Sequence, residues 1–177
     1  MKSLITERLI LRPIHQNDVE VIHQLNSLEE VQQYNTSGIP ENIEETKLHV
    51  DQLINNNNIE NQQHFTFVIE TSDENKFVGL IAINLGKPQY KNAEVWYKIS
   101  PYFWSKGFAT EALNKIISFG FIDLNLHRIE AGCAIDNIGS IKVLEKVGMK
   151  REAHTRQLLP LKSGWSDNYG YAILATD

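Results

Sequence analysis

Lys106 and Gly107 have the residue types and the position to bind a charged ligand. They directly precede a segment whose apolar and small residues recur at helical spacing, namely Ala109, Ala112, Leu113, Ile116, Ile117 and Gly120. The first amides of a helix lack acceptors within the helix, and the helix dipole adds partial positive charge at that end. Gly107 has no Cβ to keep a ligand away from the backbone, and Lys106 adds a positive charge. The segment therefore predicts a phosphate or pyrophosphate site.

A tight turn between a strand and a helix is a second explanation for Gly107, so this glycine alone does not establish a site. The surrounding segment lacks the Gly-x-Gly-x-x-Gly pattern of dinucleotide sites. It also lacks the Gly-x-x-x-x-Gly-Lys-Ser/Thr pattern of P-loops. Neither of these two nucleotide-binding folds is predicted.

One mixed sheet with helices packed on it is expected to position these residues. The predicted order of elements is β-α-α-β-β-β-α-β-α-β-β. Strands are predicted near 9–13, 65–69, 77–83, 93–99, 129–133, 149–153 and 169–174, and helices near 19–25, 45–54, 109–120 and 140–147. The asparagine tract 55–58 is predicted to be a loop. No repeat or linker divides the chain, so residues 1–177 are expected to form a single α/β (α+β) domain.

Composition narrows the class of protein. Cys133 is the only cysteine, which excludes an intramolecular disulfide and a thiolate zinc cluster, and none of the six histidines has a paired metal-ligand spacing, so no metal is predicted. The net charge of −5 argues against nucleic-acid binding and mildly favours a cationic substrate. Early charges and short apolar runs predict neither a signal peptide nor a membrane span. We therefore expect a cytoplasmic protein with no nucleic-acid or membrane partner.

The run Trp104-Ser105-Lys106-Gly107-Phe108-Ala109 resembles the acyl-CoA motif of the GNAT acetyltransferase superfamily, Gln/Arg-x-x-Gly-x-Gly/Ala, with a departure at its first position. The longer pattern Tyr-x-Trp-x-Lys-Gly-x-Ala-Thr-Glu-Ala is typical of the branch that contains the ribosomal-protein N-terminal (Rim-type) acetyltransferases. Further blocks of the resemblance are 6–12, 128–131, and Asn137-x-x-Ser140 through 145–148. The resemblance covers nearly the whole chain.

This resemblance implies a GNAT-like fold, with a mostly antiparallel sheet, helices on both faces and a splayed acetyl-CoA cleft. By resemblance, the CoA pyrophosphate is held by the amides around Lys106, Gly107, Phe108, Ala109 and Thr110. Backbone groups near Tyr97 and Ile99 are expected to pair with pantetheine, and Asn137 to contact the cofactor arm. Acetyl-CoA is then the cosubstrate and an amine the acceptor.

An amine with a pKa of about 10 is mostly protonated at neutral pH and must lose a proton before it attacks. Glu94 is the candidate base, directly or through water, because it begins the strand that leads to the motif; a solvated strand-edge glutamate is the alternative. Alternation places Glu94, Trp96 and Lys98 on one strand face.

Many enzymes of the superfamily use a tyrosine to protonate the thiolate, and the matching position here is Leu144, which has no proton to give. By resemblance to the Rim-type branch, Ser140 is expected to orient the thiol or relay a proton, with a helix cap as its alternative role. Cys133 is interpreted as a core residue, since free cysteine often packs as a small hydrophobe.

Resemblance to the Rim-type branch favours a protein N-terminal α-amine as the acceptor. A small amine, such as a polyamine, amino acid or antibiotic, stays open, because related enzymes act on such molecules. A non-catalytic acyl-CoA sensor also stays open, given Leu144. We expect segments 55–62 and 157–167 to form the acceptor side, and a homodimer is a further possibility.

Overall fold

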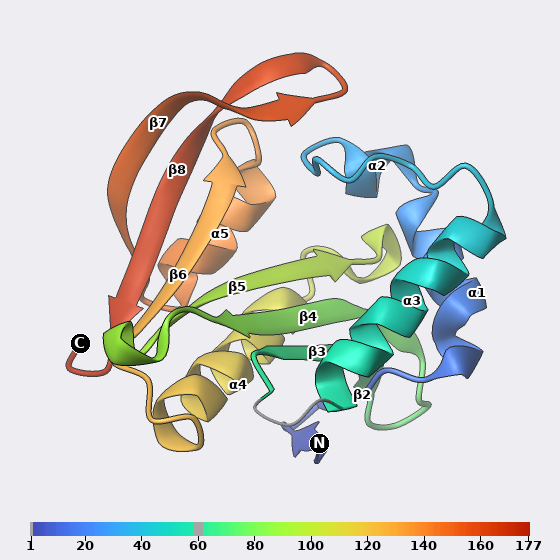
Figure 1. The fold of residues 1–177 in the computed structure, drawn as a ribbon, viewed down its shortest axis with the longest axis horizontal. Coiled ribbons are helices and arrows are strands. Elements are labelled where there is room, and N and C mark those ends of the chain that lie inside the picture. The colour runs from blue at the N-terminus through green and yellow to red at the C-terminus, as the bar shows by residue number, and fades with distance from the viewer. Residues whose placement is uncertain (1, 59–61) are drawn as a thin grey trace.

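The computed structural model describes residues 2–58 and 62–177, in which a single eight-stranded sheet carries helices on both faces (Figure 1). The strand order is β1-β2-β3-β4-β5-β6-β8-β7, and every neighbouring pair is antiparallel except β5 and β6. The strands are β1 (Leu4–Ile5), β2 (Leu9–Pro13), β3 (His64–Thr71), β4 (Phe77–Leu85), β5 (Asn92–Ile99), β6 (Arg128–Ala134), β7 (Lys150–Leu161) and β8 (Gly164–Leu174). The predicted mixed, mostly antiparallel fold is confirmed.

Helices cover the two faces of the sheet over separate apolar clusters. They are α1 (Val19–Asn26), α2 (Glu29–Gln32), α3 (Ile43–Asn58), α4 (Phe108–Ile122) and α5 (Ile138–Lys146). The larger cluster joins α4 and α5 to one face, through residues such as Ile116 and Leu144. The smaller cluster joins α1 and α3 to the other face, through residues such as Ile22 and Val50. Burial on both faces explains why β4 is almost continuously apolar and why β3 has four buried residues in succession.

The sheet opens between its two parallel strands. β5 and β6 pair only at Asn92–Arg128, Ala93–Ile129 and Glu94–Glu130. Beyond that point β5 stays paired with β4 as far as Ile99, whereas β6 stays paired with β8 along its whole length. Figure 1 shows the two strands diverging from this end. The predicted splayed gap is therefore confirmed.

The asparagine tract is helical, so its prediction as a loop is wrong. Helix α3 continues to Asn58. The buried Asn57 side chain explains this, because its Nδ2 donates to the Thr66 carbonyl at 2.9 Å and its Oδ1 accepts from the Thr66 amide at 2.9 Å. Asparagine is a weak helix former because its side chain competes for local backbone groups, and here β3 supplies the partner instead.

Three further features were not predicted. Strand β1 and helix α2 are short, with two and four residues, and have no periodic pattern long enough to identify them. Strands β7 and β8 extend beyond the predicted strands 149–153 and 169–174, across segment 157–167, and leave only a tight turn at 162–163. Within the described residues, no helix is long and apolar enough to cross a membrane.

Candidate functional site

A pocket of about 650 Å³ lies where the chain leaves the diverging ends of β5 and β6. One side, the α4–α5 wall, contains eight of the residues predicted from the sequence, namely Tyr97, Ile99, Gly107, Phe108, Ala109, Thr110, Asn137 and Ser140. The opposite side, the α2 wall, contains Glu30, Val31, Gln33, Tyr34, Asn35 and Lys98. The structure thus brings most of the predicted site residues to one cavity.

Gly107 forms the N-cap of α4 in the left-handed region, with φ of 82°. A Cβ at this position would meet only the Arg8 guanidinium, at 3.4 Å, so the space beside the backbone is otherwise open. The amides of Phe108, Ala109 and Thr110 follow in the first turn, where a helix has no internal acceptors for them. This arrangement suits an anionic group such as pyrophosphate.

The N-terminal segment holds the start of α4 in place. Arg8 donates through Nε to the Glu111 carboxylate at 2.7 Å and through Nη1 to the Lys106 carbonyl at 3.1 Å, while Thr6 Oγ1 donates to Glu111 at 2.6 Å. Burial alone would raise the pKa of Glu111, but these hydrogen bonds outweigh burial and hold the pKa below its usual value. Thr6 and Arg8, in the block 6–12 of the sequence resemblance, therefore hold the turn that precedes α4 and its first helical turn.

Lys106 lies in this turn, but its side chain does not line the pocket. The side chain is exposed and its ammonium lies 5.5 Å from the centre of the Phe103 ring. Its contribution to cofactor binding stays a prediction.

The backbone of β5 presents polar groups to the gap. The Ser100 amide donates to the Val78 carbonyl of the β4 side at 2.8 Å. Because successive residues of an antiparallel strand alternate in direction, the amides and carbonyls of Tyr97 and Ile99 face away from β4 and toward the gap. The Ile99 carbonyl accepts from Trp104 Nε1 at 2.7 Å. The departure at the first motif position thus has a structural role, and pairing of Tyr97 and Ile99 with pantetheine stays a prediction.

Ser140 is not the cap of α5, so that alternative is wrong. Asn137 is the N-cap, and its Oδ1 accepts from the Ser140 amide at 3.1 Å. The Ser140 hydroxyl instead accepts a hydrogen bond from Tyr97 Oη at 3.3 Å. Asn137 also lines the pocket, with its oxygen already used by the helix end.

Burial controls the ionisation of the groups behind this wall. It raises the pKa of Tyr97 to about 12, opposed by the hydrogen bond to Ser140 and assisted by Cys133. Burial, with the nearby Glu145 carboxylate, also raises the pKa of the Cys133 thiol to about 11. Cys133 and Leu144 both lie in the larger apolar cluster, which confirms the interpretation of Cys133 as a core residue.

Lys98 is a site residue that the sequence did not single out. Its ammonium donates to Asn26 Oδ1 at 3.1 Å and to Ser37 Oγ at 3.3 Å. Gln32 completes the network, because its Nε2 donates to the Asn26 carbonyl at 3.0 Å. Burial lowers the pKa of Lys98 to about 8. The available signal was a lysine near the end of the strand that leads to the motif.

The predicted base and the two segments predicted for the acceptor side do not line the pocket. Glu94 is exposed on β5 and does not line the cavity, so its role as a base stays a prediction. Neither 55–58 nor 157–167 lines the cavity, and 59–61 lie outside the described residues. In their place α2 and residues 33–35 form the wall opposite α4 and α5.

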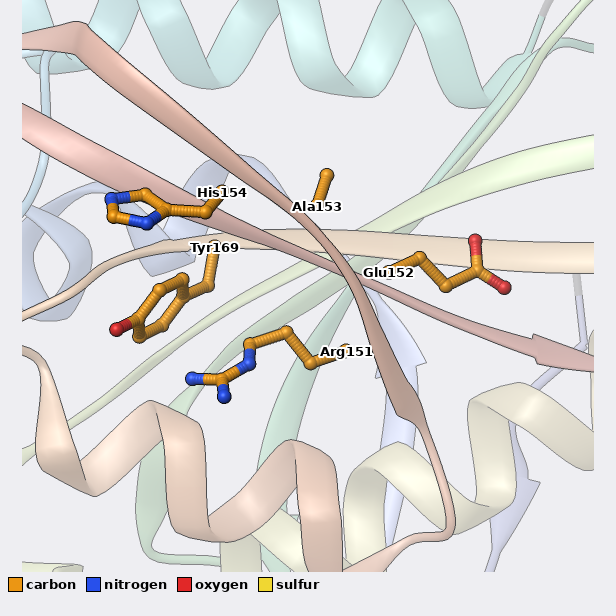
Figure 2. Close-up of a pocket in the computed structure, with 5 residues that line it drawn as sticks. All are labelled: Arg151, Glu152, Ala153, His154 and Tyr169. Carbon is orange, nitrogen blue, oxygen red and sulfur yellow. The ribbon is translucent and has the colours of Figure 1, made fainter.

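A second hollow, of about 290 Å³, lies on the β7–β8 hairpin (Figure 2). Arg151 stacks over Tyr169, with its Cζ 4.4 Å from the ring centre, and His154 pairs with Asp167 at 2.6 Å. Figure 2 shows Glu152 directed away from these side chains. None of the residues predicted for the site lines this hollow. Among the described residues, no group of three or more His, Cys, Asp or Glu side chains is placed to hold a metal ion.

The chain is similar to known acetyltransferases over most of its length. Residues 8–150 match the family model described as an acetyltransferase (GNAT) domain. YnaD of Bacillus subtilis strain 168, named as an uncharacterized N-acetyltransferase, is 33% identical over 171 residues, which is 96% of this chain and 95% of that protein. The spermidine N(1)-acetyltransferase of Vibrio cholerae serotype O1 is 28% identical over 147 residues, which is 83% of this chain and 82% of that protein.

Solved structures show the same fold. The acetyltransferase (GNAT family) from Bacillus anthracis superposes with a TM-score of 0.86 and 30% identity, over 99% of each chain. RimL, a ribosomal L7/L12 alpha-N-protein acetyltransferase solved with coenzyme A, superposes with a TM-score of 0.87 over 97% of each chain. At 21% identity, this second likeness concerns the fold alone.

Proposed function

Because the chain belongs to the GNAT acetyltransferase family, and is an N-acetyltransferase that uses acetyl-CoA, we propose that its acceptor is the α-amine of a protein N-terminus. The α4–α5 wall fits the acetyl-CoA side of this reaction. Gly107 and the free amides of α4 suit the pyrophosphate, and the gap-facing backbone of β5 suits the amides of pantetheine. The α2 wall is then left for the acceptor.

Lys98 is the observation that carries the choice of acceptor. With a pKa of about 8, it is mostly charged at pH 7, and it lies on the α2 wall. A polyamine would bring additional ammonium groups toward it, and each like charge about 6 Å away costs on the order of 2 kcal/mol near a protein surface. An N-terminal α-amine has a pKa of about 8, so part of it is neutral at pH 7, and its backbone carbonyls can accept from Lys98.

Polyamine acetylation is the second candidate. It is supported by the similarity to the Vibrio cholerae spermidine N(1)-acetyltransferase and by the net charge of −5. Glu30 on the α2 wall is exposed and offers a carboxylate to a cationic acceptor. This candidate requires that the attraction of a cationic acceptor by Glu30 be stronger than its repulsion by Lys98.

Two side chains are proposed for the chemistry. Ser140 lines the α4–α5 wall with its hydroxyl free of any capping role, so it can donate to the sulfur of the leaving thiol. Glu94 remains the proposed base and acts through water, because it is exposed and outside the pocket lining.

The test is a CoA-release assay with acetyl-CoA and a panel of acceptors: peptides with free N-termini, polyamines, amino acids and aminoglycosides. Each peptide has a control in which the α-amine is already acetylated while its lysines stay free. We expect CoA release with free N-termini only, and mass spectrometry should place the acetyl group on the α-nitrogen. Turnover with spermidine and none with peptides would establish the second candidate in place of the first.

A further inference from the structure

Tyr97 extends a buried phenol from β5 to helix α5. Its side chain packs against the larger apolar cluster, and its Oη lies 3.3 Å from the Ser140 hydroxyl oxygen. Both residues line the pocket on the α4–α5 wall. Ser140 lies one helical turn before Leu144, the position from which a proton-donating tyrosine is missing. A phenol is therefore present at this helix, but it comes from the sheet.

We propose that Tyr97 is a positioning residue that directs the Ser140 proton toward the sulfur of CoA as the thioester breaks. A hydroxyl group has one proton, and its direction follows from the hydrogen bonds that the oxygen accepts. Because Tyr97 donates to Ser140, the Ser140 proton is left free to point into the pocket. Without the phenol, that proton has no fixed direction.

The proton balance of the transfer closes on the Ser140 hydroxyl alone. The amine nitrogen forms a bond to the acetyl carbon, the C–S bond breaks, and its electron pair stays on sulfur. Ser140 gives its proton to sulfur and regains one from the amine through solvent, while Tyr97 keeps its proton and its hydrogen bond to Ser140 throughout. One proton leaves nitrogen and one arrives at sulfur, with no oxidant, reductant or metal involved.

The surroundings of Tyr97 favour this arrangement. With a pKa of about 12, the phenol keeps its proton throughout the neutral range and remains a donor. The same environment raises the pKa of the Cys133 thiol to about 11, and Cys133 is close enough to influence Tyr97. A thiolate formed at this wall is disfavoured in the same way, so the leaving sulfur needs a proton there.

The test is a double-mutant cycle of Tyr97→Phe, Ser140→Ala and the double variant, with kcat, KM for acetyl-CoA and Tm measured for each. We expect kcat to fall about tenfold in Tyr97→Phe and about 30-fold in Ser140→Ala, with KM for acetyl-CoA within about twofold of the parent. Because the two hydroxyls act in series, the double variant should be no slower than Ser140→Ala, within about twofold.

Tyr171→Phe is the matched control. Its phenol also reaches from the sheet to α5, where it donates to Glu145 at 3.3 Å, but Tyr171 does not line the pocket. This variant should also lose a hydrogen bond between the sheet and α5, and it should keep the parental kcat. A purely structural role for Tyr97 would make the two Tyr→Phe variants alike in both Tm and kcat.

The inference rests on acetyl transfer but not on the proposed acceptor, so the cycle uses whichever amine in the panel gives the fastest CoA release. A polyamine as the fastest acceptor would overturn the proposed acceptor and still allow the cycle to be measured. A parental kcat in Tyr97→Phe, or a double variant whose loss is the product of the two single losses, would overturn the role of Tyr97 alone.

Discussion

The two walls of the larger pocket offer binding groups of different kinds. The α4–α5 wall presents mainly backbone: a glycine N-cap at Gly107, the free amides of a first helical turn, and the gap-facing edge of β5. The α2 wall presents a charged side chain, Lys98, held by Asn26 and Ser37. Backbone donors suit a ligand that is the same in every related enzyme, whereas a positioned side chain can differ from one enzyme to the next. The difference suggests that the first wall binds the common cosubstrate and the second selects the acceptor.

The contrast is sharpest at neighbouring residues of β5. Tyr97 faces α5 and Lys98 faces α1 and α2, because successive strand residues point to opposite faces. Burial favours the neutral form of each, so it raises the pKa of Tyr97 to about 12 and lowers that of Lys98 to about 8. One side of the strand thus holds a fixed proton and the other a charge that changes near physiological pH.

The strongest test of the comparison is Gly107→Val. A branched side chain would occupy the space beside the first amides of α4, so acetyl-CoA affinity measured by calorimetry should fall about 100-fold. The left-handed φ of 82° adds backbone strain, which also lowers Tm. Gly164→Val is the control, because Gly164 has φ of 115° at the start of β8, and a Cβ added there would meet nothing within 4 Å. Equal losses of affinity in both variants would contradict the phosphate site.

Lys98→Met tests the other wall. Removing the charge should raise kcat/KM for spermidine about tenfold relative to a peptide N-terminus, because a like-charge repulsion is lost. Acetyl-CoA affinity should stay the same. Lys142→Met is the matched control, since Lys142 lines the same pocket from α5, and it should not change the ratio between the two acceptors. An unchanged ratio in Lys98→Met would remove the argument against polyamines.

The ratio of kcat/KM for spermidine to kcat/KM for a peptide N-terminus should also depend on pH. This effect is smaller, and its sign follows from the lowered pKa of Lys98. As pH rises from 7 through about 8, Lys98 loses its charge, while a polyamine with a pKa of about 10 stays charged. The neutral fractions of the two acceptor amines also change between pH 7 and 9, but equally for both proteins, so the relative kcat/KM for spermidine should rise about threefold more in the parent than in Lys98→Met. The ratio in Lys98→Met should vary less with pH. The same slope in both proteins would assign the effect to other groups.

Asn57→Ala should have the smallest effect on activity. It removes two hydrogen bonds to the buried Thr66 backbone, with an expected cost of about 1–3 kcal/mol in the free energy of unfolding. Since α3 does not line the pocket, kcat should stay within about twofold of the parent. The neighbouring Asn58 is exposed, so Asn58→Ala should leave the denaturation midpoint unchanged. Equal stability of both variants would contradict the structural role of Asn57.

The sequence allowed the α4–α5 wall to be predicted because its function depends on local features. A glycine, a lysine and an amphipathic helix are adjacent in the chain, whereas Tyr97, Ile99 and Asn137 were placed at the site by the resemblance to the superfamily. Ser140 was also identified, but its partner Tyr97 lies 43 residues away, so no spacing rule connects them.

The α2 wall could not be predicted, because its residues come from segments that lie far apart in the chain. Lys98 is held by groups from α1 and from the loop after α2, and α2 itself has only four residues. Neither a short helix nor a network assembled from distant segments has a periodic signal. The full length of strand β7 was not predicted, because residues 150–158 are all exposed and show no alternation of apolar and polar side chains.

The short β5–β6 ladder has a consequence for how the molecule holds together. Only three residue pairs join strands β1–β5 to strands β6–β8 within the sheet. A ligand that bonds to β5 on one side and to α5 on the other adds cross-links between these two halves. Binding of such a ligand raises the free energy of unfolding by mass action, because only the folded protein offers the gap between β5 and α5. A cosubstrate bound in the gap would in this sense complete the sheet between its two halves, and its addition should raise Tm.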